Sequence, residues 1–491
     1  MMPDTDAWNT STVNILSRMK QNPPTPTGIS ISDLKYTILE SEYVYRNAEE
    51  LAELHSCDPS KLVNSYVAFK PARLALHEAI VAVVTTVQVE AEAEMQTIVA
   101  RVHQSVLDTL DTLGLDMERN DIKEKVTRSV DAYLLNPDTP QSIENKLIVD
   151  RCIQVRSRTD GYVFGQYKAG YTERDAMIAL ATDSLFSTIA TERIKAVVTA
   201  KIKEDPAIQR ITIPEQSKRT TLLVTGGISS GKGSSVSTMK FSAEREGVSW
   251  RNIAKINGDS LKPLLLEPNT GKVKPELYSQ LAQEEASLLT KIKIKGALRD
   301  MIRNEKAPHM FFDQTRIEDD AKWGIEHGGQ VIGLIVSTDI ERAIPWASAR
   351  GIETGRYEAT QNIINNHKAV AEELMTVFVP LAGQLAQFTL VDNNVPRGTN
   401  PIVVMTVDTT HRSIVVLDEA KLGEFTKKCN INPGAINAEQ LYTRSKTKES
   451  YLTDLIAKTG YTVDVPSIAP EITVVSPPEV DPASNQPLNV K

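Results

Sequence analysis

The spacing of apolar residues divides this chain into two parts. From Ser32 to about Asp205, apolar residues recur at intervals of three and four, which is typical of amphipathic helices. From about Ile211, short apolar runs alternate with helical stretches, which predicts βαβ units and a largely parallel sheet with helices on both faces. The expected fold class is therefore an α/β domain preceded by an all-helical domain.

Three helices stand out in the first part. A segment without Gly or Pro follows Pro71 and reaches Leu113, which predicts one helix of about 40 residues with Gly114 as its stop. A second helix is expected over residues 122–134, and a third over Thr172–Lys203, opened by a capping box. Each has an apolar face that must pack against a neighbour.

Seven apolar runs in the second part have the length of strands. They are Thr221–Thr225, Ile253–Ile256, His309–Phe312, Val331–Val336, Phe388–Val391, Ile402–Val407 and Ile414–Leu417. Ligands of parallel sheets bind beyond the carboxyl ends of the strands. The residues that follow each run are therefore the candidates for chemistry.

Composition sets the domain limits and narrows the class of partner. We expect a mobile polar arm over 1–30, the helical domain over 31–205, the α/β domain over 206–425, and a helix with a Pro-rich tail over 426–491. The net charge of −8 gives no support to general nucleic-acid binding. The three cysteines and the histidines of the helical part are too scattered to predict a disulfide framework or a metal site.

The sequence shows neither a Sec signal peptide nor a membrane span. Its longest apolar stretch, near Ala79–Val89, falls well short of the about 20 residues that cross a bilayer. We expect a soluble cytoplasmic protein, although export by a dedicated secretion machine would also fit these features.

The stretch that organises the chain is a Gly/Ser-rich loop after the first strand. The loop consists of Gly226, Gly227, Ile228, Ser229, Ser230, Gly231, Lys232, Gly233, Ser234 and Ser235. Gly226, four residues and then Gly231-Lys232 reproduce the spacing of a P-loop, which predicts ATP binding with Lys232 reaching the β- and γ-phosphates. Because Gly233 stands where a hydroxyl residue is usual, we assign the Mg²⁺-side hydroxyl to Ser234, with Ser235 as second choice. The alternative is a flexible turn between strand and helix.

Two further strands end in acids. Asp259 follows the second strand after a glycine, and Asp313 ends the third, next to Thr315 and Arg316. Beside a P-loop, an acid at this edge can accept the proton of an attacking hydroxyl or hold Mg²⁺. We assign the base to Asp259, and Mg²⁺ or substrate positioning to Asp313. The alternative for each is a helix N-cap.

Arginines follow the fourth strand. Arg342, Arg350 and Arg356 lie in a segment that also contains two glycines, and guanidinium groups stabilise the charge of a phosphoryl group in transit. We assign this role to Arg350 and Arg356, with Arg342 as a possible replacement for Arg350. The alternative is a solvated helix face.

The order of these pieces resembles the zeta-toxin family of P-loop kinases, with a loop similar to the adenylate kinase variant. The likeness covers about residues 220–394. It is carried by the loop, Ile256-Asn257-Gly258-Asp259 with Lys262-Pro263, a long helix over 275–304, Phe311-Phe312-Asp313-Gln314-Thr315-Arg316, the arginine segment ending at Arg356, Asn365-Asn366 and Val391-Asp392-Asn393-Asn394. The resemblance implies a catalytic set of Lys232, Asp259, Arg356 and Arg350 or Arg342.

Differences from the family lie on the acceptor side. Asp313-Gln314 stand in place of the usual glutamate and glycine, and Lys262 stands in place of an arginine. Lys262, Asp313, Thr315 and Arg316 form the expected substrate-binding set. Family members phosphorylate UDP-N-acetylglucosamine, and relatives use other acceptors, including nicotinamide dinucleotides. The resemblance leaves the choice among such acceptors open.

The function expected from the sequence is that of a toxin- or effector-like kinase. It would use ATP and Mg²⁺ to phosphorylate a hydroxyl of a small, nucleotide-containing molecule. Because zeta toxins are silenced by a small helical partner, the resemblance also allows an inhibitory or delivery role for residues 32–205, or a protein partner bound there. The alternatives are a nucleotide-gated partner-binding protein and a protein-directed kinase.

Overall fold

The computed structural model describes residues 59–136, 173–265 and 283–465, with gaps at 328, 355–357, 359, 397–398, 409–410, 436–439, 444–452, 454–456 and 458. The described residues form two compact units. The sheet unit contains Thr212–Asn257 and the described residues from Met301 onward. The helical unit contains the described residues up to Ile211 and those of Gly258–Asp300. The boundaries expected from the sequence at residues 30, 205 and 425 stay predictions.

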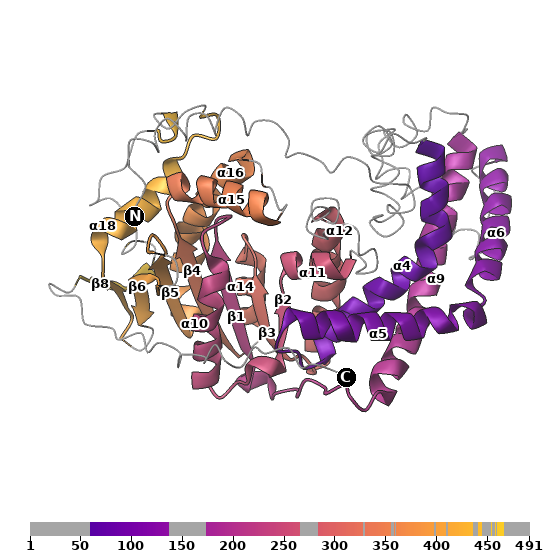
Figure 1. The fold of residues 1–491 in the computed structure, drawn as a ribbon, viewed down its shortest axis with the longest axis horizontal. Helices are drawn as coiled ribbons and strands as arrows, with labels where there is room; N and C mark the ends of the chain where they lie inside the picture. Colours follow the sequence, from indigo (N-terminus) through magenta and orange to yellow (C-terminus); the bar gives the residue numbers. More distant parts are fainter. Residues whose placement is uncertain are drawn as a thin grey trace, which may run out of the picture. The chain divides into compact units, whose positions relative to one another are not determined.

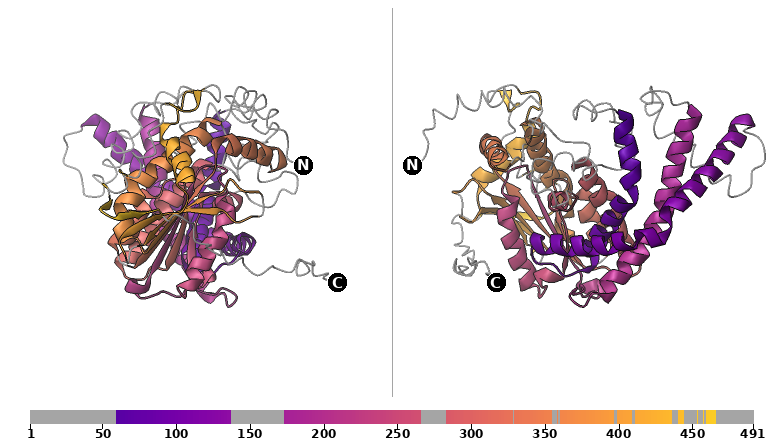
Figure 2. Two further views of the ribbon diagram at one scale, coloured as in Figure 1. Left: turned by 90° about the vertical axis from the view of Figure 1, so that its left-hand side faces the viewer. Right: turned by 45° about the vertical axis from the view of Figure 1, so that its right-hand side comes forward.

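An eight-stranded sheet forms the centre of the sheet unit, in the order β2-β3-β1-β4-β5-β6-β7-β8 (Figure 1). The strands are β1 Thr220–Gly226, β2 Ile253–Ile256, β3 His309–Asp313, β4 Gln330–Ser337, β5 Gln387–Asp392, β6 Ile402–Asp408, β7 Ser413–Val416 and β8 Thr462–Asp464. Strands β1 to β5 pair in parallel, whereas β6 is antiparallel to both its neighbours. The strands fan across one another with the twist of open sheets (Figure 2).

The predicted strands and the α/β class are confirmed, and an eighth strand was missed. All seven expected apolar runs are strands, with ends displaced by no more than one residue. The additional strand, β8, is three residues long and pairs in parallel with β7. Its residues are exposed or half-buried, so no apolar run marks it in the sequence.

Helices and helical turns of the sheet unit connect the strands. They are η2 Gln216–Lys218, α10 Lys232–Arg245, η3 Trp250–Asn252, α14 Glu318–Glu326, α15 Ile340–Thr354, α16 Thr360–Glu373, η7 Leu374–Phe378, α17 Val379–Leu381, η8 Ala382–Gln384, α18 Glu419–Lys427 and η9 Lys428–Asn430. Helix α13 Lys295–Arg303 begins in the helical unit and ends in the sheet unit.

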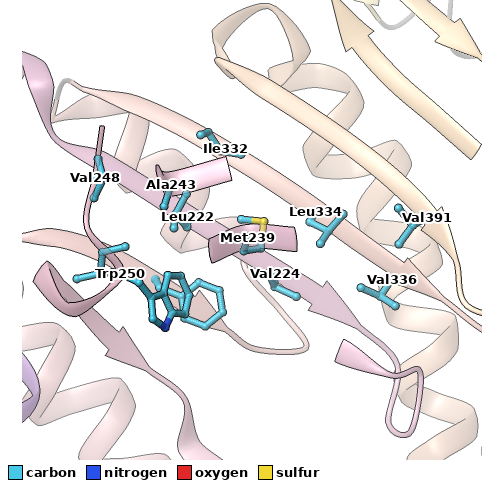
Figure 3. Close-up of a cluster of buried hydrophobic side chains, with 12 residues drawn as sticks. Leu222, Val224, Met239, Ala243, Val248, Trp250, Ile332, Leu334, Val336 and Val391 are labelled. Atoms are coloured by element: carbon cyan, nitrogen blue, oxygen red, sulfur yellow. The ribbon is translucent and has the colours of Figure 1, made fainter. Parts of the chain in front are cut away.

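Helices cover both faces of the sheet. On one face, Met239 and Ala243 of α10 pack with alternate residues of β1 and β4, including Leu222 (Figure 3). On the other face, Gly324 of α14 lies so close to Thr221 that an added Cβ would meet the threonine methyl at 3.3 Å. Because the fully buried strand β1 is covered on both sides, its carboxyl end has a fixed position.

The helical unit contains helices in the regions where the sequence predicts them, and a segment that follows β2. Its elements are α4 Pro59–Thr86, α5 Glu92–Leu110, η1 Asp111–Leu113, α6 Leu115–Leu135, α9 Glu173–Glu204, α11 Gly258–Leu265, α12 Gln283–Leu288 and the π-helical turn η6 Leu289–Ile294. Helix α9 packs against α4, α5 and α6. None of the helices in the described ranges is long and apolar enough to cross a membrane.

One expected helix is divided in two. The predicted helix over Pro71–Leu113 is wrong, because α4 begins earlier and ends at Thr86, and α5 begins at Glu92. Between them, Val87 forms a β-bridge with Arg210 and the amide of Gln88 donates to the carbonyl of Gln209 over 2.9 Å. These tertiary hydrogen bonds replace helical ones in a run of β-branched residues, which favour extended backbone. The predicted stop at Gly114 is confirmed by its left-handed φ of 65°.

A buried ionic network ties α4 to the segment that follows β2. The guanidinium of Arg73 donates to Glu285 from Nε over 2.7 Å and from Nη2 over 2.5 Å, and from Nη1 to the carbonyl of Leu265 over 2.7 Å. His77 also contacts Glu285, and its other ring nitrogen lies 3.1 Å from the ammonium of Lys293. Burial, together with the charge of Lys293, lowers the pKa of His77. The network therefore satisfies Glu285 completely and holds the end of α11.

We expect Glu285→Ala to lower the free energy of unfolding by about 3–5 kcal/mol, because it leaves the buried guanidinium of Arg73 without its counter-ion. Urea unfolding measures this loss. The control is Glu318→Ala, which removes an exposed i,i+4 pair with Lys322 and should cost about 1 kcal/mol or less. Equal losses in the two variants would contradict the prediction.

Candidate functional site

The loop after β1 has the backbone of an anion-binding nest. Ser229 has a φ of 60° and Gly231 a φ of 87°, so two residues of the loop adopt left-handed conformations. The amide of Ser230 donates to the carbonyl of Gly227 over 3.1 Å and closes a turn. Helix α10 begins at Lys232, directly after Gly231. Loops of this kind direct successive N–H groups to one point at a helix N-terminus, where phosphate binds well.

Close packing explains two of the loop glycines. An added Cβ on Gly226 would meet the Ser230 hydroxyl at 2.5 Å and the Val336 carbonyl at 2.7 Å. An added Cβ on Gly227 would meet the ring of His367 at 2.4 Å. The two glycines are thus required by close contact with the sheet and with α16.

Lys232 lies over the loop that precedes it. Its ammonium donates to the carbonyl of Gly226 over 2.8 Å and to that of Gly227 over 3.4 Å. Among the described residues, the hydroxyls of Ser229, Ser230 and Ser235 are buried and have no hydrogen-bond partner. Buried polar groups without partners are costly and indicate a ligand or water in the functional state.

The ends of β2 and β3 are joined next to β1. The amide of Asn257 donates to the carboxylate of Asp313 over 3.0 Å. The amide of Gln314 donates to the carbonyl of Val224 over 3.1 Å, and the hydroxyl of Thr225 donates to the carbonyl of Thr315 over 2.8 Å. In the parallel register Asp313 lies beside Val224 of β1, and the prediction that Asp259 and Asp313 both open on the edge of the P-loop stays a prediction. The neighbouring Arg316 is exposed.

Asp259 and Lys262 belong to the helical unit. Both lie on α11, which the chain enters directly from Asn257, and the ammonium of Lys262 lies 2.6 Å from a carboxylate oxygen of Asp259. The carboxylate is 55% exposed, whereas the lysine stem is buried. The two residues, both predicted from the sequence, thus form an ion pair between the first-turn acid of α11 and a lysine of its last turn.

The three arginines have different surroundings. Arg342 lies in the first turn of α15, with its guanidinium 5.0 Å from the ring centre of Trp346. This cation–π contact on one helix matches the alternative of a helix-surface role. Arg350 is half-buried near the end of the same helix. Arg356 lies outside the described residues, as does the side chain of Ser234, so their roles stay predictions.

Sequence reasoning missed His367, Asn393 and Lys428 as parts of the site. His367 of α16 donates from Nε2 to the carbonyl of Ile228 over 3.0 Å, and Asn393 after β5 donates to the carbonyl of Ser230 over 3.0 Å. Burial, with a smaller effect of the nearby Lys428 charge, lowers the pKa of His367 to about 3, so the ring is neutral. The paired asparagines after β5 were noted as a motif, but nothing local to His367 marks it.

Lys428 is a buried cation behind the loop. Its ammonium donates to the hydroxyl of Ser337 over 2.7 Å and to the carbonyl of Thr338 over 2.6 Å, at the end of β4. Burial lowers its pKa to about 8. The turn η9 is therefore fixed to the strand next to the loop.

Glu373, the last residue of α16, contacts the segment after β3. One of its carboxylate oxygens accepts the amide of Ile317 over 3.2 Å. Burial raises the pKa of Glu373 to about 7, although the nearby charge of Arg316 opposes the shift. Its carboxyl is protonated in the folded state at pH values where it ionises in the unfolded chain.

The raised pKa of Glu373 makes stability depend on pH. Between about 4.5 and 7 the folded state binds more protons at this site than the unfolded chain, so the free energy of unfolding falls as pH rises. We expect Glu373→Gln, which keeps the acceptor oxygen, to be more stable than the unchanged chain at pH 8 and nearly equal to it at pH 5. Urea unfolding at both pH values checks this. A constant difference between them would contradict the assignment.

These residues could hold a nucleoside triphosphate together with a divalent cation. The loop amides and Lys232 would bind the phosphates, and the buried Ser235 hydroxyl and the carboxylate of Asp313 lie on elements that meet at the same edge. The described residues contain no group of three or more His, Cys, Asp or Glu side chains that could hold a metal alone.

Comparison with known proteins gives distant structural likenesses. No protein-family model and no curated protein matches the sequence. The crystal structure of AvrRxo1-ORF1:-ORF2 with ATP has 16% identity and a TM-score of 0.35, covering 50% of this chain and 77% of that chain. The native AvrRxo1-ORF1:-ORF2 complex has 14% identity and a TM-score of 0.34, covering 67% and 89%.

A toxin–antitoxin structure is also similar. The PezAT chromosomal system of the human pathogen Streptococcus pneumoniae has 11% identity and a TM-score of 0.28, covering 54% of this chain and 94% of that chain. At these sequence identities and TM-scores, the activity is inferred from the residues of this chain and not from the similar structures.

Proposed function

We propose that this protein is an ATP-dependent phosphotransferase that moves the γ-phosphoryl group to a hydroxyl of a small molecule. The observation that carries the proposal is the loop after β1, with left-handed residues at Ser229 and Gly231 and Lys232 as the first residue of α10. Three buried serine hydroxyls without partners in the described part of the chain surround it. A mere connecting turn would not require buried polar groups to stay unsatisfied.

The reaction would divide among residues as follows. Lys232 and the loop amides bind the β- and γ-phosphates, and Asp259 takes the proton of the acceptor hydroxyl. The acceptor oxygen forms a bond to the γ-phosphorus while the bond to the ADP oxygen breaks. Ser234 or Ser235 and Asp313 would hold Mg²⁺, which when bound would neutralise charge on the phosphates. Arg350 and Arg356 stabilise the phosphoryl group in transit.

The acceptor class is a nucleotide-containing metabolite, a nucleotide sugar above all. Support comes from the expected acceptor side, where Lys262 and Arg316 supply positive charge and Asp313 and Thr315 supply polar groups. A second phosphate-bearing molecule suits such cations. The resemblance to zeta toxins points to the same class.

The test incubates the full chain with Mg²⁺ and γ-labelled ATP, with and without UDP-N-acetylglucosamine or a nicotinamide dinucleotide. The full chain is needed because a fragment without α4 would leave the buried Glu285 without Arg73. We expect label on a small molecule, identified by mass. Slow hydrolysis to free phosphate alone, with partner affinity that changes on adding ATP, would instead indicate a nucleotide-gated binding protein. Label on polypeptide would indicate a protein-directed kinase.

A further inference from the structure

Three side chains, two of them from distant parts of the chain, donate to carbonyls of the phosphate loop. The carbonyl of Gly226 accepts from Lys232, that of Ile228 from His367, and that of Ser230 from Asn393. The two tethers from outside the loop come from α16 and from the end of β5. The Gly227 carbonyl also accepts, from Lys232 and from the amide of Ser230, so held carbonyls leave the peptide groups of the loop a restricted set of orientations.

We infer that His367 is a positioning residue, with Asn393 as its counterpart, that holds the loop in its phosphate-binding conformation before ATP arrives. This inference rests on the proposed function, since it takes the loop to be a triphosphate site. His367 touches the loop and not the reacting atoms, so its effect is on nucleotide affinity. Ordering a loop on binding costs free energy and lowers affinity. A loop that is already ordered in the free protein avoids this cost.

The surroundings of His367 make it a rigid support. The residue is buried, with only 3% of its surface exposed. Because a carbonyl oxygen can only accept, the contact with Ile228 is a hydrogen bond in the tautomer that carries the ring proton on Nε2. A neutral ring suits this site beside the cations Lys428 and Lys232. The same ring fills the space that a side chain at Gly227 would need. Histidine and glycine therefore depend on each other sterically.

The side chain of Ile228 adds a second anchor at the same residue. It packs against an apolar cluster from α15, α16 and the segment after η9, which includes Ile344, Ile363 and Ile431. The carbonyl of Ile228 is held by His367 and its side chain by this cluster. The segment that includes Ile431 lies beyond the region of resemblance to zeta toxins, so the C-terminal part of the sheet unit also supports the loop.

The experiment measures ATP binding by calorimetry for the full chain and for two size-matched variants. His367→Leu removes the donor, and His367→Gln keeps an N–H at a position equivalent to Nε2. We expect His367→Leu to weaken ATP binding roughly 10-fold or more, and His367→Gln to restore most of it. Asn393→Leu should weaken ATP binding in the same direction.

His309 provides a matched control at the opposite end of β1. This buried histidine accepts the amide of Thr220 over 3.0 Å, so His309→Leu also removes a buried hydrogen bond, in this case to β1 and not to the loop. We expect His309→Leu to lower the melting temperature but to leave the ATP dissociation constant within about 3-fold of the unchanged chain.

The outcomes separate the two proposals. If the unchanged chain fails to bind ATP, the proposed function is overturned and this inference with it. If it binds ATP and His367→Leu binds equally well, only the positioning role is overturned. A loss of affinity in His367→Leu that His367→Gln does not reverse, or that His309→Leu matches, would assign His367 to general packing and overturn the inference.

Discussion

Replacing Lys232 with alanine should lower the rate of ATP-dependent phosphoryl transfer by roughly 10³–10⁵-fold, the size of effect of a single cation on the transferred group. Its ammonium lies 2.8 Å from the carbonyl of Gly226, within the loop that would hold the phosphates. The alanine variant lacks this positive charge at the first residue of α10. Transfer of label from γ-labelled ATP, measured at saturating acceptor, gives the rate.

Lys218 is the control for Lys232. It lies on η2 just before β1, and its exposed side chain pairs with Glu215 over 3.0 Å. Because an exposed pair contributes about 1 kcal/mol or less to stability, Lys218→Ala should keep both fold and rate. A Lys232→Ala protein with an unchanged rate would mean that the loop is a connecting turn, the alternative that the sequence left open.

The sequence predicted the strands because each one is a local apolar run. β2 was placed residue for residue at Ile253–Ile256, and β1 was extended by a single residue at each end. Strands that are buried on both faces consist of nearly continuous apolar residues, so the sequence alone identifies them. β8 is an edge strand of three residues with the alternation exposed, half-buried and exposed, and it lacks this signal.

Tertiary contacts decided what the sequence could not. Helical periodicity continues across residues 87–91 in the sequence. The helix is nevertheless interrupted there, because Val87 pairs with Arg210, more than a hundred residues away. The same holds at the loop. Its spacing was evident from neighbouring residues, whereas its support by His367 depends on α16 packing beside β1. The local sequence pattern identifies the phosphate-binding loop, whereas only the fold identifies the side chains that hold the loop in place.

Asp259→Asn should lower the rate of phosphoryl transfer by roughly 10²–10⁴-fold while leaving ATP affinity nearly unchanged, because a general base contributes this much and does not bind the nucleotide. The carboxylate is 55% exposed on the first turn of α11 and pairs with Lys262, so the amide should be accommodated without unfolding. Single-turnover transfer from labelled ATP gives the chemical rate, and calorimetry gives the affinity.

Asp319→Asn is the matched control, because Asp319 is likewise an exposed acid in the first turn of a helix, α14. As a first-turn acid it interacts favourably with the helix dipole, a contribution of about 0.3–1 kcal/mol to stability, and it should not affect transfer. If Asp259 were only such an acid, as its position at a strand-to-helix turn also allows, the two variants would behave alike. A loss of transfer confined to Asp259→Asn, with ATP affinity retained, therefore separates the base from the helix-terminus role.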